Sequence, residues 1–447
     1  LVYLWGSMDY ADQNRDPSYS PQLLEQLYQE AAGAREDESF RDAILSAYRE
    51  NPENLLLAAW YQRLQATGTV TTSSGPESHR PRWWLAVPMG VLTGLIFWAI
   101  SSPDLMFLDH LPYVALLWAP VAAVGVMGFL VLAGTSSSGR AGAMGLVLAA
   151  ACAYVFLIAP IQIESVQQHY LNLMALHLPL LALVAVGVTL VGMRENRQDR
   201  FAFLLKSLEI FVTCGLFGIA GVIFVQITAG MFESLGIVIT DSIARLVAAL
   251  GAGMIPVLGV VTIYNPAAAP FGQDFSRGLS RLIATLTRIL LPLTAGVLLV
   301  YICFIPFNFM GPFEDRELLI IFNVMLFAIM ALLLGAIPIN AEDLSDRVQL
   351  YLRRGIVAVA CLAVIVSLYA LAAIVYRTID GGLTVNRLTV IGWNSINIAT
   401  LILLVYRQAR ADGESWVSAL HSVFSTAAYG YVAWGLFVVV AIPLLFL

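Results

Sequence analysis

Residues 112–134 read PYVALLWAPVAAVGVMGFLVLAG and contain no charged side chain. At about 1.5 Å per residue, an apolar helix of this length crosses the roughly 30 Å hydrocarbon core of a bilayer. Ten further stretches are apolar and long enough to do the same. They lie near 83–101, 141–160, 171–193, 208–228, 244–264, 287–308, 318–338, 355–376, 388–406 and 422–447. The sequence therefore predicts an all-α, polytopic transmembrane helix bundle of about 11 spans over residues 83–447.

The composition agrees with a membrane protein. Apolar residues make up 59% of the chain and charged residues 12%, whereas soluble domains carry about 25% charged residues. A soluble fold of this size needs a larger polar shell, so hydrocarbon has to surround most of the chain. The formal net charge of −6 argues against nucleic acid as a partner. The four cysteines are isolated in apolar runs, so we expect no metal site and no disulfide.

The first 67 residues have a different character, with eleven acidic residues and five arginines. Apolar residues at helical spacing predict three short helices, over 21–34, 38–50 and 52–67. We expect residues 1–67 to form an acidic cytoplasmic helical segment, either as a minimal three-helix bundle or as helices that lie on a protein partner. Residues 68–82, rich in Thr, Ser, Gly and Pro, are predicted to be a flexible linker. Residues 1–7 are too short for the apolar core of a signal peptide and contain no basic residue before it. Met8 is a candidate for the natural start.

Basic residues predict the orientation of the spans. With the N-terminus inside, the inner loops and span ends hold fifteen Lys and Arg residues and the outer ones hold four. Positive charge is enriched on the cytoplasmic side of membrane proteins. We therefore expect a multi-pass protein of a bacterial inner membrane, with a cytoplasmic N-terminus and the C-terminus outside.

Sequence motifs for catalysis are lacking. No Walker loop, HExxH, GxSxG or dinucleotide fingerprint occurs in a strand–loop–helix context that would make it functional. We accordingly predict no cofactor and no energy from nucleotide hydrolysis in this chain, and an enzyme is the less favoured reading. Among the acids of the outer loops, Asp109 is the candidate for a catalytic acid of a transferase, with simple solvation as the alternative.

A few polar residues lie within or beside the spans. Glu209 begins the fifth span three residues after Lys206, which suggests either a proton relay or an ion pair at the interface. His177 lies in the fourth span and either titrates near neutral pH or bonds a neighbouring helix. Gln226 and Asn323 are predicted to form interhelical hydrogen bonds.

Three arginines, Arg277, Arg281 and Arg288, share one helical face because their spacings are four and seven residues. The apolar residues after Arg288 already suffice to span the bilayer. We expect this basic inner stripe to reach anionic lipid headgroups, with binding of a substrate phosphate as the alternative.

The outer end of the tenth span is the predicted functional site. Gly381 and Gly382 form a turn, Thr384 is a predicted N-cap, and Arg387 then falls at N3. A cation in the first helical turn opposes the helix dipole, so Arg387 needs a compensating anion. Asp380 and the acidic loop Glu314–Glu317 are the internal candidates, and a lipid phosphate or an anionic substrate is the external alternative.

Two asparagines extend this site into the membrane. Asn394 is expected on the same face as Arg387, and Asn397 about 80° round the helix. Together they predict a polar stripe that runs inward from the outer surface. The alternative is an Arg387–Asp380 clamp, with both asparagines bonding neighbouring helices.

The stretch Gly382-Leu383-Thr384-Val385-Asn386-Arg387, followed at once by an apolar span, resembles a turn of a bacterial polytopic membrane family. That family is catalogued as domain of unknown function 4153. The chain has Gly381 where the family often has an aromatic residue. The resemblance implies a many-span layout and supplies no reaction.

Three functions follow from these observations. The first is a transporter-like or lipid-handling protein, since prolines within spans permit the broken helices that such proteins use. The second is a non-catalytic subunit or assembly factor whose cytoplasmic helices bind a partner. The third is a membrane-embedded transferase that acts on a lipid-linked substrate. Membrane lipids are expected partners in all three.

Overall fold

The computed structural model describes residues 81–446 apart from 135, 193–195, 236, 238, 277 and 414. It also describes residues 24, 25, 28, 40, 44, 46–48, 54, 56–61 and 63. The chain divides into two compact units, Leu1–Arg80 and Pro81–Leu447.

The described residues of the first unit form a small apolar core. Phe40 and Ile44 are fully buried, and Leu24 and Trp60 are nearly so. The Phe40 and Trp60 rings meet edge to face with their centroids 5.9 Å apart. These residues come from all three of the helices predicted for the first 67 residues, so the described core joins three segments of the chain. The remainder of those segments lies outside the described residues.

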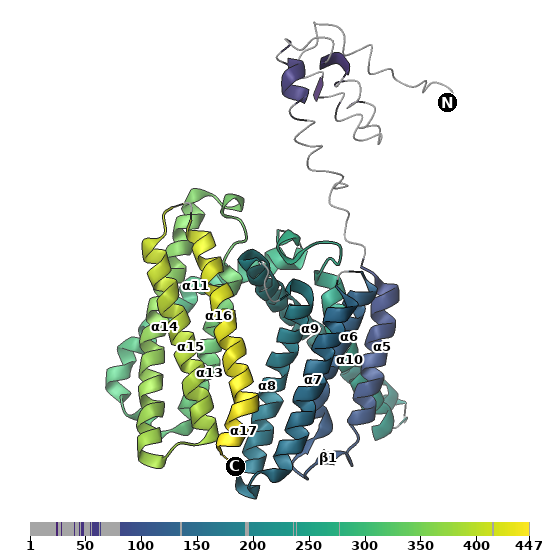
Figure 1. The fold of residues 1–447 in the computed structure, drawn as a ribbon, viewed down its shortest axis with the longest axis vertical. Helices are drawn as coiled ribbons and strands as arrows, with labels where there is room; N and C mark the ends of the chain where they lie inside the picture. The colour runs from purple at the N-terminus through teal and green to yellow at the C-terminus, as the bar shows by residue number, and fades with distance from the viewer. Residues whose placement is uncertain are drawn as a thin grey trace. The chain divides into compact units, whose positions relative to one another are not determined.

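The second unit is built from helices, most of them long (Figure 1). The α-helices are α5 Trp83–Ile100, α6 Tyr113–Leu132, α7 Ser138–Ile158, α8 Glu164–Val191, α9 Arg197–Ser234, α10 Asp241–Ile263, α11 Gly278–Phe304, α12 Gly311–Glu314, α13 Arg316–Ala336, α14 Asp346–Gly381, α15 Val385–Arg410, α16 Trp416–Leu436 and α17 Ile442–Leu445. Short 3₁₀ turns are Ala159–Ile161, Pro270–Gly272, Ile305–Asn308 and Ala341–Asp343, and a π-helical segment is Phe437–Ala441. A two-stranded hairpin pairs β1 Met106–Phe107 with β2 Leu111–Pro112.

Among the described residues of this unit, eleven helical segments are long and apolar enough to cross a membrane. The predicted all-α transmembrane bundle is thereby confirmed, and so is its number of spans. Because eleven is odd, the first span begins at one end of the bundle and the last finishes at the other. Figure 1 shows the start of α5 and the C-terminus at opposite ends of the helices.

Close helix packing joins α5 to α10. A Cβ atom added at Gly94 would lie 2.7 Å from the Leu250 Cα atom, which is closer than side-chain carbons approach a backbone. A Cβ atom added at Gly253 would likewise lie too close to the backbone of Gly94, at its Cα atom. Small residues at a crossing let two helix backbones approach in a membrane, where van der Waals packing drives association. These glycines therefore fix the first helix of the bundle onto α10.

Two other helix groups complete the bundle. An apolar core joins α6, α7 and α8, and Val438 and Val439 of the π-helical segment pack into it. A second core joins α11, α13, α14, α15 and α16. Contacts of α8 with α15 and α16 connect the two groups, and α9 contacts both α8 and α16.

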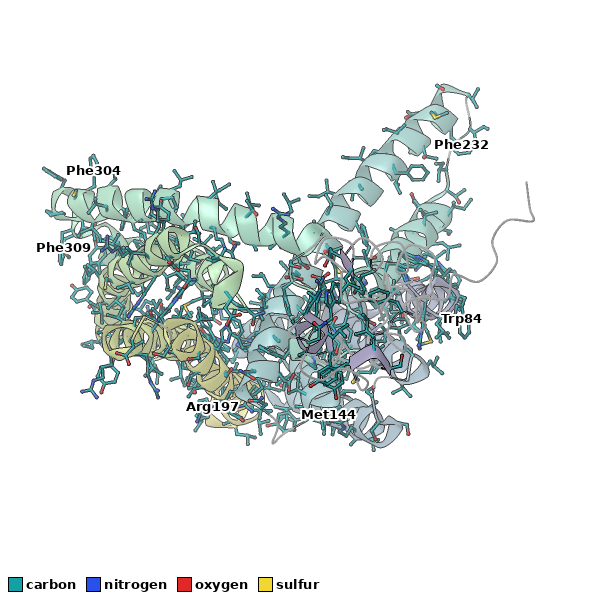
Figure 2. The ribbon with its side chains drawn as sticks, turned by 90° about the horizontal axis from the view of Figure 1, so that it is seen from above. Trp84, Met144, Arg197, Phe232, Phe304 and Phe309 are labelled. Carbon is teal, nitrogen blue, oxygen red and sulfur yellow. The ribbon has the colours of Figure 1, made fainter. Side chains whose placement is uncertain are left out.

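Two spans are mostly exposed on the surface of the chain. Only 6% of the most apolar window of α9 and 11% of that of α11 is buried, whereas the other spans range from 22% to 56%. Seen from above, α9 runs toward Phe232 and α11 toward Phe304, in diverging directions (Figure 2). At about 1.5 Å per residue, the 38 residues of α9 extend about 57 Å, well beyond the thickness of the hydrocarbon core.

Candidate functional site

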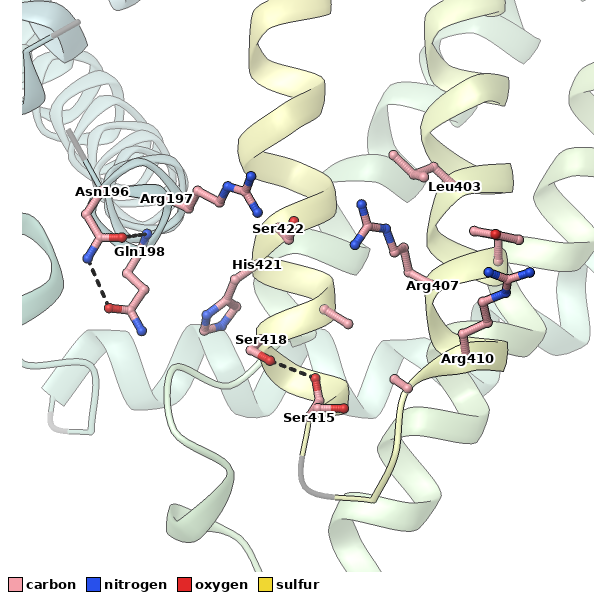
Figure 3. Close-up of a pocket in the computed structure, with 13 residues that line it drawn as sticks. Asn196, Arg197, Gln198, Leu403, Arg407, Arg410, Ser415, Ser418, His421 and Ser422 are labelled. Atoms are coloured by element: carbon pink, nitrogen blue, oxygen red, sulfur yellow. Dashed lines mark hydrogen bonds between the residues drawn. The ribbon is translucent and has the colours of Figure 1, made fainter. Parts of the chain in front are cut away.

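An open pocket of about 850 Å³ lies where the start of α9, the end of α15 and the start of α16 come together (Figure 3). Three arginines, three serines and a histidine give it a polar lining. They are Arg197, Arg407, Arg410, Ser415, Ser418, Ser422 and His421. No acidic residue is among the described residues that line this pocket. The pocket is therefore basic.

Local sequence places the ends of these helices at the pocket. The Asn196 side chain caps α9 by accepting a hydrogen bond from the Gln198 backbone N–H, 3.4 Å away. This cap sets the start of the helix and puts Arg197 in its first turn. At the other side, α15 ends with Arg407 and Arg410 in its last turn, where cations are favoured by the helix dipole.

Two of the arginines, Arg197 and Arg407, extend toward α16 from two other helices. In Figure 3 the side chain of Arg197 extends from α9 and that of Arg407 from α15, with Ser422 of α16 between them. Both arginines are exposed. In the described part of the chain, neither guanidinium makes an ion pair or a hydrogen bond. The donors of both groups are therefore available to a ligand.

Helix dipoles of both signs meet at the pocket, and the negative C-terminal end of α15 is offset by Arg407 and Arg410 in its last turn. The pocket lies at the N-terminal ends of α9 and α16, where unpaired backbone N–H groups carry partial positive charge. Arginine suits planar, bidentate binding of phosphate and carboxylate groups. The arrangement of charges therefore selects an anion and disfavours a cation.

His421 holds the floor of the pocket in place. Its Nε2 atom lies 3.0 Å from the Pro338 carbonyl oxygen, so this nitrogen carries the proton and donates it. The ring also stacks on Phe201, with the ring centroids 3.9 Å apart. These contacts tie the start of α16 to α9 and to the connection between α13 and α14. His421 is thus a positioning residue for the serines of α16.

Lys206 and Glu209 form a buried cluster elsewhere on α9. The Lys206 Nζ atom donates to Glu209 Oε2 at 2.8 Å, to the Asp274 carbonyl at 2.6 Å and to Ser280 Oγ at 3.1 Å. Ser280 Oγ in turn donates to Glu209 Oε2 at 2.6 Å. Lys206, Glu209 and Ser280 are all at most 5% exposed. All three ammonium donors are occupied, and the cluster joins α9 to α11.

The His177 side chain reaches α15. Its Nδ1 atom lies 2.8 Å from the Leu173 carbonyl, and its Nε2 atom accepts a hydrogen bond from Trp393 Nε1 at 3.0 Å. A carbonyl can only accept and an indole N–H can only donate, so the ring is neutral with its proton on Nδ1. His177 therefore bonds a neighbouring helix, as one of the two readings of the sequence expected.

The two asparagines of α15 turn to different helices. Asn394 Nδ2 donates to Asn323 Oδ1 of α13 at 2.8 Å, and Asn323 donates to the Leu319 carbonyl. Asn397 Oδ1 instead accepts a hydrogen bond from the Tyr431 hydroxyl of α16. Both asparagines are at most 2% exposed. Their hydrogen bonds link α15 to two partners, in place of one stripe that leads to Arg387.

Arg387 caps the preceding helix. Thr384 is the N-cap of α15 and accepts a hydrogen bond from the Arg387 backbone N–H, so Arg387 stands at N3 as predicted. Its Nη1 atom donates to the Gly382 carbonyl at 2.6 Å, at the C-terminal end of α14. A cation is favoured at that end of a helix dipole. The guanidinium is thus compensated by backbone, and Asp380 is exposed without an ion pair to it among the described residues.

Gly381 and Gly382 make this cap feasible. Gly382 has a φ of +77°, a positive value that glycine adopts without strain because it has no Cβ atom. A Cβ atom at Gly381 would lie 2.9 Å from Arg387 Nη1, so a larger residue would push the guanidinium away.

The remaining predicted residues do not meet at one place. Gln226 is exposed on α9, and no hydrogen bond from its side chain to a described residue is found. Arg288 donates to the Ala336 carbonyl at 3.3 Å, Arg281 is exposed, and Arg277 lies outside the described residues. Asp109 is exposed in the turn between β1 and β2, with a φ of +57°.

Comparison of the chain with protein-family models, with curated proteins and with solved structures gives no match. The resemblance to the family of unknown function therefore stays a prediction, and the function has to be argued from the site.

Proposed function

We propose that this chain is a transporter-like, lipid-handling integral membrane protein that binds an anionic group in the pocket between α9, α15 and α16. The observation that carries the proposal is the pair Arg197 and Arg407, which line one pocket from α9 and α15 with no ion pair among the described residues. Two like charges that line one pocket repel each other, and a bound anion offsets this repulsion. A phosphate or a carboxylate supplies that anion.

The location of the pocket supports the same proposal. The excess of basic residues at one end of the spans supports a location of this end at the cytoplasmic surface of a bacterial inner membrane. Residues 1–67 are then cytoplasmic and the C-terminus lies outside. The eleven apolar helices are in contact with membrane lipids, whose phosphate groups lie at the level of the span ends. Membership of the family catalogued as domain of unknown function 4153 is part of this proposal.

Binding of a soluble anion to the full chain tests the proposal. The purified chain in detergent is titrated with glycerol 3-phosphate at low ionic strength, and the heat of binding is measured. A hydrogen bond to a charged group contributes about 1.5–3 kcal/mol. We therefore expect Arg407→Gln to weaken binding by about ten- to a hundredfold, and Arg197→Gln to do the same.

Arg354→Gln is the matched control, because Arg354 is exposed near the same end of the bundle and does not line the pocket. It removes the same charge and should leave the affinity unchanged. Equal weakening by all three variants would show a general charge effect and contradict a built site. Absence of any binding to the unchanged chain would also overturn the proposal.

A second candidate function has support from one observation. The exposed apolar surfaces of α9 and α11 suit a non-catalytic subunit that binds another membrane protein. Residues 1–67 then provide a further contact with the partner. Extraction from the native membrane in a mild detergent, followed by native mass measurement, tests this candidate. A complex heavier than the chain with its lipids supports it, and a single copy of the chain contradicts it.

A further inference from the structure

The exposed surface of α16 continues from the pocket along the helix. Ser415, Ser418 and Ser422 line the pocket, and the next residues on the same face recur every three or four positions. They are Thr426, Tyr429, Ala433, Leu436 and Val440, and all five are exposed. This spacing is that of one face of a helix. Val440 lies in the π-helical segment that continues α16, and we call these five residues the α16 stripe.

The chemistry of this face changes with distance from the pocket. Hydroxyl groups dominate near the arginines, since Ser415, Ser418, Ser422 and Thr426 follow one another on the helix face. Farther on, the stripe contains Ala433, and then leucine and valine. Between the two parts lies the Tyr429 ring, with the Arg200 guanidinium 5.1 Å from its centroid. A polar end and an apolar end on one surface match an amphiphile.

The dimensions agree with a lipid. From Ser422 to Ala433 the helix rises about 16 Å, at about 1.5 Å per residue. Half of a hydrocarbon core is roughly 15 Å, which is the depth that an acyl chain of one leaflet covers. The pocket volume of about 850 Å³ lies in the upper part of the range for whole small-molecule sites. A bare phosphate ion leaves most of such a pocket empty.

We infer that the ligand is an anionic glycerophospholipid from the leaflet at this end of the bundle. Its phosphate lies between Arg197 and Arg407, and one acyl chain lies along the α16 stripe. The inference rests on the proposed function and names its substrate class. The inference also names the origin of the anion. A lipid has an acyl chain that can contact the apolar part of the α16 stripe, whereas a free phosphate has none.

Lipid binding to the full chain tests this inference. The chain in detergent is titrated separately with phosphatidylglycerol, with phosphatidylcholine and with glycerol 3-phosphate, and bound ligand is counted by native mass spectrometry. We expect phosphatidylglycerol to bind at least about tenfold more tightly than either of the others, which corresponds to about 1.4 kcal/mol. Arg407→Gln should remove this preference over phosphatidylcholine.

A bulky residue on the stripe separates the lipid from the free anion. Ala433→Trp fills the exposed face of α16 without changing the pocket, and should weaken phosphatidylglycerol binding while glycerol 3-phosphate binds as before. Ala220→Trp, at an exposed alanine on α9 outside the pocket, is the matched control and should leave both unchanged. The lipid inference would be overturned if phosphatidylglycerol binds no more tightly than glycerol 3-phosphate, or if Ala433→Trp leaves the lipid affinity unchanged. In either case the proposed anion site would still stand. Failure of both phosphatidylglycerol and glycerol 3-phosphate to bind would overturn the proposed function together with the inference.

Discussion

The two ends of α15 use their arginines in opposite ways. At one end, Arg387 donates to the Gly382 carbonyl and caps the C-terminus of α14. At the other end, Arg407 extends into an open pocket without a partner among the described residues. A guanidinium that is bonded to backbone stabilises the fold, whereas an unpaired one is available to a ligand. The same residue type on one helix therefore serves structure at one end and, in our proposal, binding at the other.

The same contrast occurs along α9. Lys206 is 2% exposed and all its donors are occupied, while Arg197, nine residues earlier, is exposed in the pocket. Basic residues at the ends of the spans thus divide into those with occupied donors and those with free donors. This division predicts which substitutions reduce stability and which reduce binding.

The largest expected effect is on stability, from Lys206→Met. Loss of the ammonium leaves the buried Glu209 carboxylate without its cation, and breaking a buried pair in this way costs about 3–5 kcal/mol. We expect the free energy of unfolding in detergent to fall by about that amount. The double variant Lys206→Met, Glu209→Leu removes both charges and should recover much of the loss. A single variant as stable as the unchanged chain would show that the cluster does not hold α9 to α11.

A smaller effect distinguishes the two ends of α15. Arg387→Ala removes one hydrogen bond and a favourable charge at a helix C-terminus, and should lower the free energy of unfolding by about 1 kcal/mol. Arg407→Ala removes no bond to a described residue and should change it by less than about 0.5 kcal/mol. Glycerol 3-phosphate binding should respond in the reverse order. Equal stability losses in the two variants would contradict the contrast between the two ends.

Local signals in the sequence were sufficient to predict the spans and one helix start. Apolar runs give the eleven membrane helices because each run is contiguous and its length is set by the bilayer. Thr384 and Arg387 were correctly placed at N-cap and N3, since a cap depends on residues three apart. The partner of Arg387 was not predicted, because it is a backbone carbonyl of the preceding helix, and a sequence pattern does not show which carbonyls are unpaired.

The candidate pocket could not be predicted from the sequence for a related reason. Arg197 and Arg407 are more than two hundred positions apart in the chain, and each by itself looks like an ordinary basic residue at the end of a span. Both residues line one pocket only because α9, α15 and α16 pack together. Asn394 and Asn397 show the same limit, since their helix face was predictable but their separate partners, Asn323 and Tyr431, were not.

Tyr264 represents a third kind of polar group, one that is buried and has no hydrogen bond to a described residue, and its removal should have only a small effect on stability at neutral pH. It ends α10, is 2% exposed, and its hydroxyl finds no hydrogen-bond partner among the described residues. Burial, helped by the charge of Asp199, raises the pKa of Tyr264 to about 12 from an ordinary value near 10. In contrast to Lys206, its removal leaves no partner group without a hydrogen bond. Tyr264→Phe should therefore change the free energy of unfolding at pH 7 by less than about 1 kcal/mol.

The raised pKa of Tyr264 predicts a pH dependence with a definite sign. Below pH 10 the phenol is neutral in both the folded and the unfolded chain, so it adds no pH dependence there. Between about pH 10 and 12 the unfolded chain loses this proton and the folded chain keeps it, so stability falls as pH rises. Unfolding measured from pH 8 to 12 should show a shallower decline for Tyr264→Phe than for the unchanged chain. If the free energy of unfolding falls with pH equally in the two proteins, the prediction is wrong. The Tyr264 hydroxyl would then be hydrated or hydrogen-bonded in the folded state.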